Sequence, residues 1–473
     1  MRPTIFIILF GLSLSARPAS AEALSRAIAV SRALHQNPQL AAARAAEDQA
    51  RSHAAQVDSA RLPTITLTAA VGPSLKAKLV PGTGDLSTKN QYGDVGLRDL
   101  SVSMGGELSV LQPIYTFGKI EQRARAAEHE LKARQSQTQM TRAQVALAVA
   151  QLYEGLLFAR AAERFFQETE RWLERSRQDT QRELENETGA REQDILRFDA
   201  ALGAMRLGLH QASAAKRQAT AGVVAYLDLA SGSTIEPAET EFALLDFPAG
   251  KPRLLIARAR AARPELSALS EASSTYRALA SAEAAGNWPD LFALLFASGA
   301  YTPGRDVAGS RYVRDPLNGF YPGVLVGARW QITGFMASER ANENRAKARE
   351  LDETSRWAVA GLSAEVLKAF EDATRARADA ETTQAAVSSA KRWSVLASAD
   401  YSVGLGDIRE LSDSTQAYVQ LRVALYDAIY RHNVALAELE RATGGFGCTS
   451  GQQIYPCEER AHGHSITTTT TDH

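Results

Sequence analysis

The chain has 473 residues, of which 53 are basic and 54 acidic, so its formal net charge is −1. This balance provides no basic surface for a nucleic acid. Aromatic residues make up 7% of the chain, and alanine is abundant in the long segments, a composition that favours closely packed helices. We find no glycine-rich phosphate loop, no His and Glu at metal-ligand spacing and no nucleophile elbow in the sequence. We therefore expect no enzyme activity, no cofactor and no metal site.

Residues 1–21 have the pattern of a secretory signal peptide. Arg2 supplies a positive charge, the stretch from Ile5 to Leu14 is apolar, and Ala19-Ser20-Ala21 is a small-residue cleavage site. We expect cleavage after Ala21 and export of the mature protein. No apolar run of about 18 residues follows. If the protein lies in a membrane, it must therefore cross it as a β-barrel.

Residues 22–444 contain one series of patterns twice, which is the signature of a duplicated fold. Leu62-Pro63 follows Asn37-Pro38 at the spacing at which Trp288-Pro289 follows Arg263-Pro264. The expected organisation is a first repeat at 22–232, a linker at 233–250, a second repeat at 251–444 and a disordered tail at 445–473.

The elements of each repeat are predicted in the same order. Residues 22–61 have helical periodicity, interrupted at Pro38. The alternation from Thr64 to Val71 predicts a strand with one apolar face. In the first repeat we predict strands at about 64–72 and 103–115, followed by a long helix pair at about 118–230. In the second repeat we predict strands at about 291–301 and 323–332, followed by a long helix pair at about 336–444.

The long helices have the apolar spacing of helices packed in the manner of a coiled coil. The spacing is carried by Val145, Val149, Leu152 and Leu156 in the first repeat and by Leu362, Val366, Ala369, Ala373, Ala376 and Ala380 in the second. Four strands are too few to close a barrel, because about eight are the minimum. An open sheet would also leave strand edges unpaired. We therefore expect a mainly α fold with short β strands, in which several chains share one barrel.

In their order and spacing these features resemble the TolC-like outer membrane efflux protein family across residues 22–444. The resemblance rests on the two proline motifs of the first repeat, on Leu111-Gln112-Pro113-Ile114-Tyr115-Thr116-Phe117-Gly118, and on Tyr401-Ser402-Val403-Gly404-Leu405 before the last helix. It implies a homotrimer, with a 12-stranded β-barrel surrounded by the lipid of the cell outer membrane and a continuous α-helical barrel in the periplasm.

The resemblance also implies a function. The family's channels are passive exit ducts of tripartite efflux or type I secretion systems. They dock to a periplasmic adaptor (membrane fusion) protein and, through it, to an inner-membrane transporter. The alternative for this sequence is a periplasmic coiled-coil scaffold or adaptor without a pore, although such a protein has no use for four membrane-length strands.

The turns between the long helices are the candidate docking sites. Val403-Gly404-Leu405 resembles the family's tip motif, which the adaptor grips, and Thr188-Gly189-Ala190 is the weaker counterpart in the first repeat. Glycine is also the residue that ends helices for backbone reasons, because it adopts the left-handed conformation at low cost. Both roles are compatible, since the glycine makes the turn and its apolar neighbours make the contact.

The residues around the second turn are candidates for a periplasmic gate. Tyr401 matches a gate tyrosine of the family, and Glu410 and Asp413 share one helix face at positions where the family has acidic rings. The alternative for Glu410 is a capping box with Asp407. Asp194 is the nearest counterpart in the first repeat, but it lies five residues after Gly189 whereas Glu410 lies six after Gly404.

Two further groups of residues have two interpretations each. Cys448 and Cys457 could form a disulfide in an oxidising periplasm, or remain two tail thiols that matter little to the fold. Aromatic residues near the strand ends could form the interfacial belt of a membrane barrel, or pack where strands meet helices; they are Tyr115, Phe117, Trp288, Trp330 and Phe335.

Overall fold

The computed structural model describes residues 23–78, 96–186, 191–247, 251–306, 314–332, 335–403 and 405–445. The expected signal peptide, the expected tail from residue 446 and both cysteines lie outside these ranges.

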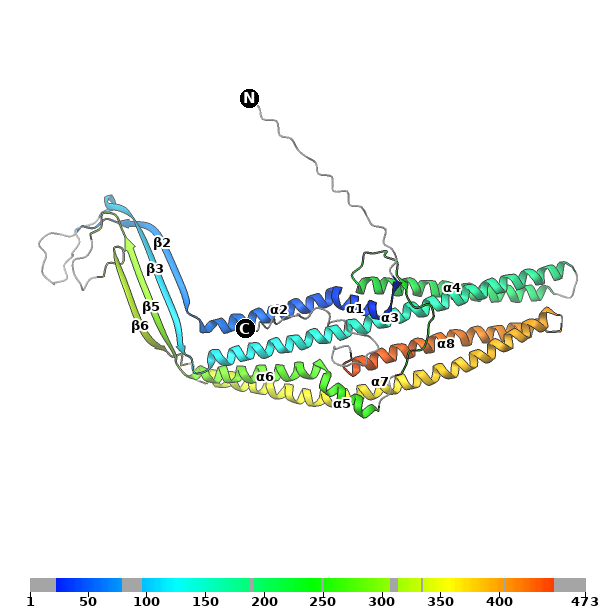
Figure 1. Cartoon of the computed structure of the whole chain (residues 1–473). Helices are drawn as coiled ribbons and strands as arrows, with labels where there is room; N and C mark the ends of the chain where they lie inside the picture. Colours follow the sequence, from blue (N-terminus) through cyan, green and yellow to red (C-terminus); the bar gives the residue numbers. More distant parts are fainter. Residues whose placement is uncertain are drawn as a thin grey trace, which may run out of the picture. The chain divides into compact units, whose positions relative to one another are not determined.

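The same six elements occur twice along the chain (Figure 1). The first series is α1 (Arg26–Gln36), α2 (Pro38–Asp58), β2 (Thr64–Leu75), β3 (Leu100–Tyr115), α3 (Lys119–Glu185) and α4 (Glu192–Tyr226). The second is α5 (Pro252–Ala262), α6 (Pro264–Ala284), β5 (Asp290–Tyr301), β6 (Gly319–Arg329), α7 (Met336–Ser402) and α8 (Ile408–Ala442). Matching helices have equal lengths of 11, 21, 67 and 35 residues. The predicted fold class, a duplicated mainly helical chain with short strands, is confirmed.

Strand pairing moves several predicted boundaries. β6 begins at Gly319, earlier than the predicted start near Gly323, because Gly319 still pairs with Ala300 of β5. β2 continues to Leu75, which pairs with Leu100 at the start of β3. Local alternation could not show these ends, since glycine and proline interrupt the apolar pattern in both places.

The chain forms two compact units, and each takes segments from both repeats. We call Ala43–Thr138 with Pro264–Ala360 the sheet unit. We call the described residues of Met1–Ala42, Gln139–Arg263 and Gly361–His473 the helical unit. The repeats are therefore units of sequence, and neither is a compact body by itself.

The sheet unit contains one antiparallel sheet with the strand order β2-β3-β5-β6. The register places Ile65, Val110, Leu295 and Val324 in one row across the four strands. Because side chains alternate along a strand, every second residue from this row points to the same face. That face, here called the apolar face, carries Ile65, Leu67, Ala69, Val71, Pro73 and Leu75, then Leu100, Val102, Met104, Gly106, Leu108 and Val110, then Ala293, Leu295, Ala297, Gly299 and Tyr301, and finally Phe320, Pro322, Val324, Val326 and Ala328.

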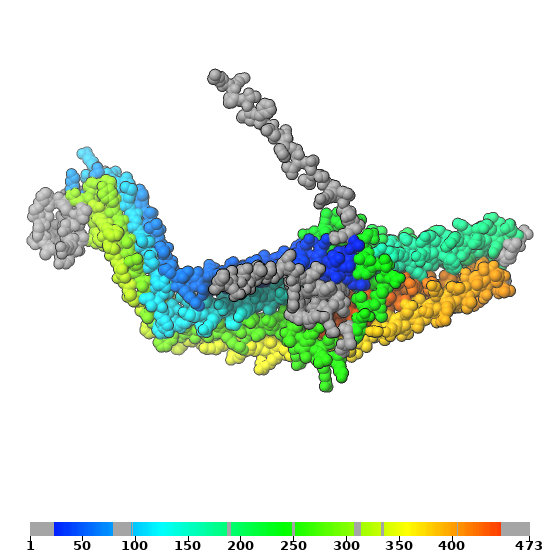
Figure 2. Space-filling view, in the orientation of Figure 1, coloured from blue at the N-terminus to red at the C-terminus, as the bar shows by residue number. Residues whose placement is uncertain are grey.

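Much of the apolar face is open to the surroundings of the chain. Leu67 is 76% exposed, Val71 72% and Val324 75%. In the space-filling view no helix of the sheet unit lies over the visible side of its strands (Figure 2). A soluble protein rarely leaves so wide an apolar surface uncovered.

The opposite face is a mixture of hydroxyl groups, glycines and aromatic rings. Phe296 pairs with Gly323, and Phe292 pairs with Gly327. A Cβ atom at Gly323 would lie 2.3 Å from Phe296 Cζ, and one at Gly327 would lie 2.8 Å from Phe292 Cζ. Each ring therefore occupies the space above a glycine, a cross-strand packing known to support glycine in sheets.

In each repeat a proline separates the first two helices. The side chain of the residue before this proline donates a hydrogen bond to a carbonyl in the last turn of another helix. Asn37 Oδ1 accepts hydrogen bonds from the backbone N–H of Gln39 and Leu40, and Asn37 Nδ2 donates to the carbonyl of Tyr226, the last residue of α4, at 3.0 Å. In the second repeat Arg263 Nη1 donates to the carbonyl of Arg441, in the last turn of α8, at 3.2 Å. Different side chains thus perform one task, which is to satisfy a carbonyl at a helix C-terminus.

The core of the helical unit follows the apolar spacing predicted from sequence. On α3, Val145, Val149 and Leu156 are at most 1% exposed, and Leu152 packs against the cluster that contains Val145 and Val149. All six predicted seam residues of α7 are buried. One 18-residue segment of α3 is apolar enough to cross a membrane, contrary to our expectation from the sequence. However, 56% of this segment is buried inside the protein. Core helices commonly have this property, so it does not indicate a membrane span.

A buried polar network attaches the linker to α3 and α8 of the helical unit. Glu154 of α3 is fully buried and accepts hydrogen bonds from Arg26 and from Asn433 Nδ2. Asn433 Oδ1 accepts from the backbone N–H of Leu245, and Tyr153 donates to Glu239. The buried carboxylate of Glu154 is thus paired and hydrogen-bonded, as such groups must be.

Candidate functional site at the helix tips

Four helix ends meet at the candidate site, which lies in the helical unit. They are the C-terminal ends of α3 and α7 and the N-terminal ends of α4 and α8. Leu173, Phe198 and Leu202 from the first repeat pack with Ile408 and Leu411 from the second. The apolar contact between the two repeats positions the polar residues around it.

Tyr401 joins the two repeats by a hydrogen bond. Its hydroxyl oxygen lies 3.3 Å from Thr180 Oγ1 of α3, and Thr180 also donates to the carbonyl of Ser176. Burial raises the pKa of Tyr401, and the nearby carboxylates of Glu183 and Asp194 act in the same direction. The phenol therefore stays neutral and able to donate near neutral pH. Thr180, which the sequence did not single out, is 1% exposed.

Glu410 and Asp413 are both exposed on the first turns of α8. Asp407 is the N-cap, and its carboxylate accepts a hydrogen bond from the backbone N–H of Arg409. Glu410, however, accepts a hydrogen bond from the indole N–H of Trp393 on α7 at 3.4 Å. Asp407 therefore caps α8, but only this half of the alternative capping box is formed, since the Glu410 carboxylate bonds to α7 instead.

Asp194 has different surroundings from the two exposed acids. It is 5% exposed, and its carboxylate accepts a hydrogen bond from the backbone N–H of Arg191 at 2.9 Å. This is an N-terminal cap at the first turn of α4. The structure therefore does not bring Asp194 together with Glu410 and Asp413 on one exposed surface.

The turn between α7 and α8 presents apolar side chains. Val403 is 66% exposed and Leu405 84%. The N–H groups of Leu405 and Gly406 both donate to the carbonyl of Asp400. A Cβ atom at Gly406 would lie 2.8 Å from the backbone nitrogen of Tyr401, so the turn requires glycine there. Gly404 and the other tip, Thr188-Gly189-Ala190, lie outside the described residues.

The aromatic residues near the strand ends cluster in the sheet unit. The rings of Tyr115 and Phe117 are 4.7 Å apart, and those of Phe117 and Trp288 stack at 5.4 Å. Trp330 donates its indole N–H to the carbonyl of Asn287, and Phe335 is 86% exposed. Three of the five rings pack together, and all except Phe117 are exposed, which fits both interpretations. Within the described ranges, no group of three or more His, Cys, Asp or Glu side chains could hold a metal ion.

Comparisons with known proteins agree with this arrangement. Residues 29–193 match the family model described as outer membrane efflux protein, and no curated protein matches the chain. Among solved structures, the CmeC outer membrane channel of Campylobacter jejuni is 18% identical, with a TM-score of 0.72 and 94% of each chain covered. CusC is 17% identical, with a TM-score of 0.71 over 88% of this chain and 91% of that one. The MtrE outer membrane channel of Neisseria gonorrhoeae is 16% identical, with a TM-score of 0.70 over 89% and 88%.

These structures share the fold over nearly the whole chain, and the family match covers the first repeat from α1 to the start of α4. The resemblance predicted from the sequence is confirmed: residues 29–193 match the outer membrane efflux protein family, and the chain shares the fold of solved outer membrane channels.

Proposed function

We propose that the protein is the outer membrane channel of a tripartite efflux or type I secretion system, acting as a passive exit duct. The observation that carries this proposal is the apolar face of the sheet, which extends across all four strands. Exposed apolar side chains of this kind are favourable where the sheet contacts the lipid of a membrane. A periplasmic scaffold without a pore would have to cover it with protein.

The sheet edges support assembly into a homotrimer, the state of the family's channels. Among the described residues, β2 and β6 each pair on one side only. An open edge is unstable in lipid because its N–H and C=O groups lack partners. The strands alternate in direction, so β6 of one chain can pair antiparallel with β2 of the next. Three chains joined in this way close a ring of 12 strands without leaving an edge.

The same arrangement places the long helices in the periplasm. A helix of 67 residues, such as α3, is about 100 Å long, which suits a duct between the outer membrane and an inner-membrane transporter. The exposed Val403 and Leu405 offer the contact for a periplasmic adaptor protein, and the Thr188-Gly189-Ala190 tip would offer the second. Gly404 lies between them in the sequence and completes the proposed docking motif.

The periplasmic end would be gated by Tyr401 and lined by acids. In a trimer, Glu410 and Asp413 would bring six carboxylates into a narrow opening. Like charges at short range repel one another, and bound cations relieve the repulsion. We therefore propose that these two acids favour cations at the pore. Asp194, being buried in a cap, would contribute to the shape of α4 more than to this ring.

The proposal is tested by the conductance of the purified protein in planar lipid bilayers. We expect discrete cation-preferring channels, and a reduced cation preference in the variant carrying Glu410→Gln and Asp413→Asn. The matched control is Asp379→Asn, which removes an exposed carboxylate from α7 far from the turn. Absence of channels would refute the function. Channels whose selectivity is the same in all three proteins would refute only the roles of the two acids.

A further inference from the structure

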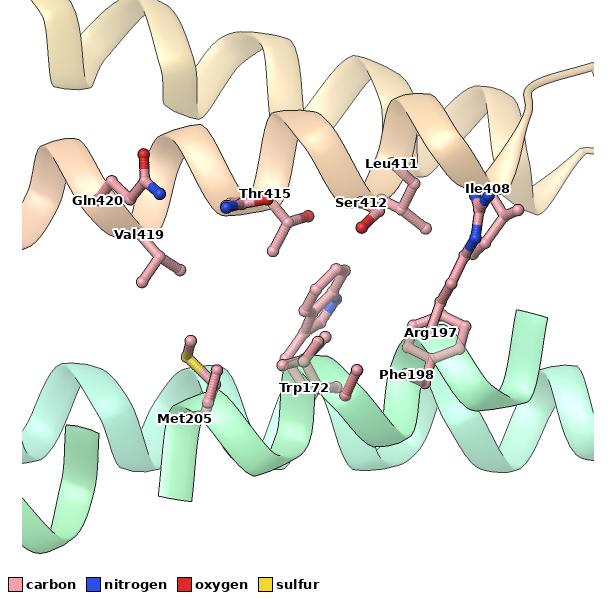
Figure 3. A pocket seen from close by; sticks show the side chains of 15 residues that line it. Trp172, Arg197, Phe198, Met205, Ile408, Leu411, Ser412, Thr415, Val419 and Gln420 are labelled. Atoms are coloured by element: carbon pink, nitrogen blue, oxygen red, sulfur yellow. The ribbon is translucent and has the colours of Figure 1, made fainter. Parts of the chain in front are cut away.

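The helical unit contains a cavity that the channel function does not use. Its volume is about 430 Å³, within the range of small-molecule sites. It lies between α3 and α4 of the first repeat and α8 of the second, close to the helix tips (Figure 3). Along α8 its wall runs from Ile408 to Gln420, a distance of about 18 Å. The cavity is therefore long enough for an elongated molecule.

Most of the cavity wall is apolar. Trp172 projects from α3 toward α8, with Phe198 and Met205 of α4 beside it and Val419 of α8 opposite (Figure 3). Phe198 and Val419 are buried. Aromatic and aliphatic side chains of this kind favour a flat hydrophobic body, because burial of its surface supplies the binding free energy.

One end of the cavity is positively charged. Arg197 extends from α4 toward Ile408 in the first turn of α8 (Figure 3). It is the only charged side chain among the lining residues, and within the described part of the chain it forms no ion pair. A guanidinium group binds carboxylates and sulfonates through paired N–H donors. No carboxylate side chain lines the cavity to compete for it.

The cavity also contains a polar atom without a partner. Thr415 Oγ1 of α8 is buried and forms no hydrogen bond within the described residues. Such an atom costs free energy until a partner reaches it. Gln416 and Gln420 add neutral hydrogen-bonding groups along the same wall. The neutral polar groups thus lie along α8, while the opposite wall is apolar except for Arg197.

From these observations we infer that the cavity is a binding site for an elongated amphipathic organic anion. The acidic group binds Arg197, the hydrophobic body packs against Trp172, Phe198 and Met205, and a polar group along the body meets Thr415. A bound molecule would touch both repeats and hold α8 at its present distance from α4. The site is complete within one chain, so the inference does not depend on the proposed channel function.

The test is calorimetric titration of the full-length mature protein in a non-ionic detergent with biphenyl-4-carboxylate. Its cationic analogue, biphenyl-4-ylmethylammonium, carries the same rings with the opposite charge. We expect saturable binding of about one anion per chain and much weaker binding of the cation. Arg197→Gln should weaken binding of the anion about tenfold, as expected when a charge-assisted hydrogen bond is lost. Arg175→Gln, at an exposed arginine of α3 outside the cavity, should not.

A second variant keeps the test independent of charge. Val419→Trp would fill the cavity and should abolish binding of the anion while thermal unfolding stays cooperative. Three results would overturn the inference: no saturable binding, equal affinity for anion and cation, or equal affinity in the wild-type protein and the Arg197→Gln variant.

Discussion

The hydroxyl of Tyr401 lies 3.3 Å from Thr180 Oγ1, and this hydrogen bond connects the last turn of α7 to α3. The two residues are in different repeats and are separated by 221 positions in the chain. Tyr401 also packs against the apolar cluster in which Ile408 and Leu411 contact Leu173 and Phe198. Movement of the α7–α8 turn away from α3 would have to break the hydrogen bond first.

We expect Tyr401→Phe to make the channel open more readily. The variant loses one neutral hydrogen bond worth about 1 kcal/mol, while Thr180 keeps its bond to the carbonyl of Ser176. An equilibrium between closed and open states would shift about fivefold. The open fraction of single channels in planar bilayers measures this shift. Tyr418→Phe is the control, because Tyr418 packs in the same unit and its hydroxyl forms no hydrogen bond within the described residues.

Val71→Asp should impair insertion into the outer membrane, whereas Thr68→Asp should be tolerated. Val71 is on the apolar face and 72% exposed, while Thr68 points to the opposite face. A carboxylate facing lipid costs on the order of 1–2 kcal/mol per chain. The amount of protein in purified outer membranes, measured by immunoblot, separates the two variants. Equal amounts would mean that the apolar face does not contact lipid.

Gly323→Ala should destabilise the sheet, because the added methyl group would lie 2.3 Å from Phe296 Cζ. Displacing the ring costs about 1–3 kcal/mol. Gly72→Ala is the matched control, since no atom lies within 4 Å of the Cβ position there. The readout is the temperature at which the detergent-purified protein dissociates on an electrophoretic gel. Replacing Phe296 with leucine in the same chain should restore stability, and failure of this rescue would refute the packing argument.

The ion pair between Glu163 of α3 and Lys216 of α4 predicts a pH dependence of stability. Burial raises the pKa of Glu163, but hydrogen bonds from Lys216 and Ser213 together lower it by more, so the folded value is below the ordinary one. A depressed carboxyl pKa stabilises the folded state above the unfolded pKa of about 4.5. The contribution is lost as the pH falls through the folded pKa.

Glu163→Gln should therefore lower the unfolding temperature at pH 7 and have little effect at low pH, once Glu163 is protonated. We expect a loss of about 1 kcal/mol at pH 7, because Lys216 is partly exposed and the pair is screened by solvent. Glu168→Gln is the control, since Glu168 is exposed and forms no ion pair within the described residues. An equal effect of Glu163→Gln at both pH values would contradict the assigned role of the pair.

Local patterns in the sequence predicted most of the fold. The buried seam of α3, the apolar face begun by Ile65 and Leu67, and the break at Asn37-Pro38 all follow from the periodicity and backbone chemistry of neighbouring residues. Strand ends did not follow, because pairing partners such as Ala300 and Gly319 lie far apart in the sequence. The compact units also could not be predicted, since each is built from both repeats.

The candidate site was predicted less completely than the fold. Tyr401, Glu410 and Asp413 were found through the resemblance of their motif to a family. Thr180 and Trp393 were missed, because neither belongs to a motif and each acts only through a contact between two helices. Asp194 has the same residue type as Asp413, but the sequence could not show that its carboxylate is used in a buried cap.

The central claim is that three chains form one outer membrane duct, and single-particle imaging of the mature protein extracted from outer membranes tests it most directly. The account predicts a threefold particle with 12 strands at one end and a helical tube on the order of 100 Å long at the other. A monomeric particle, or a protein recovered from the periplasm without detergent, would contradict it.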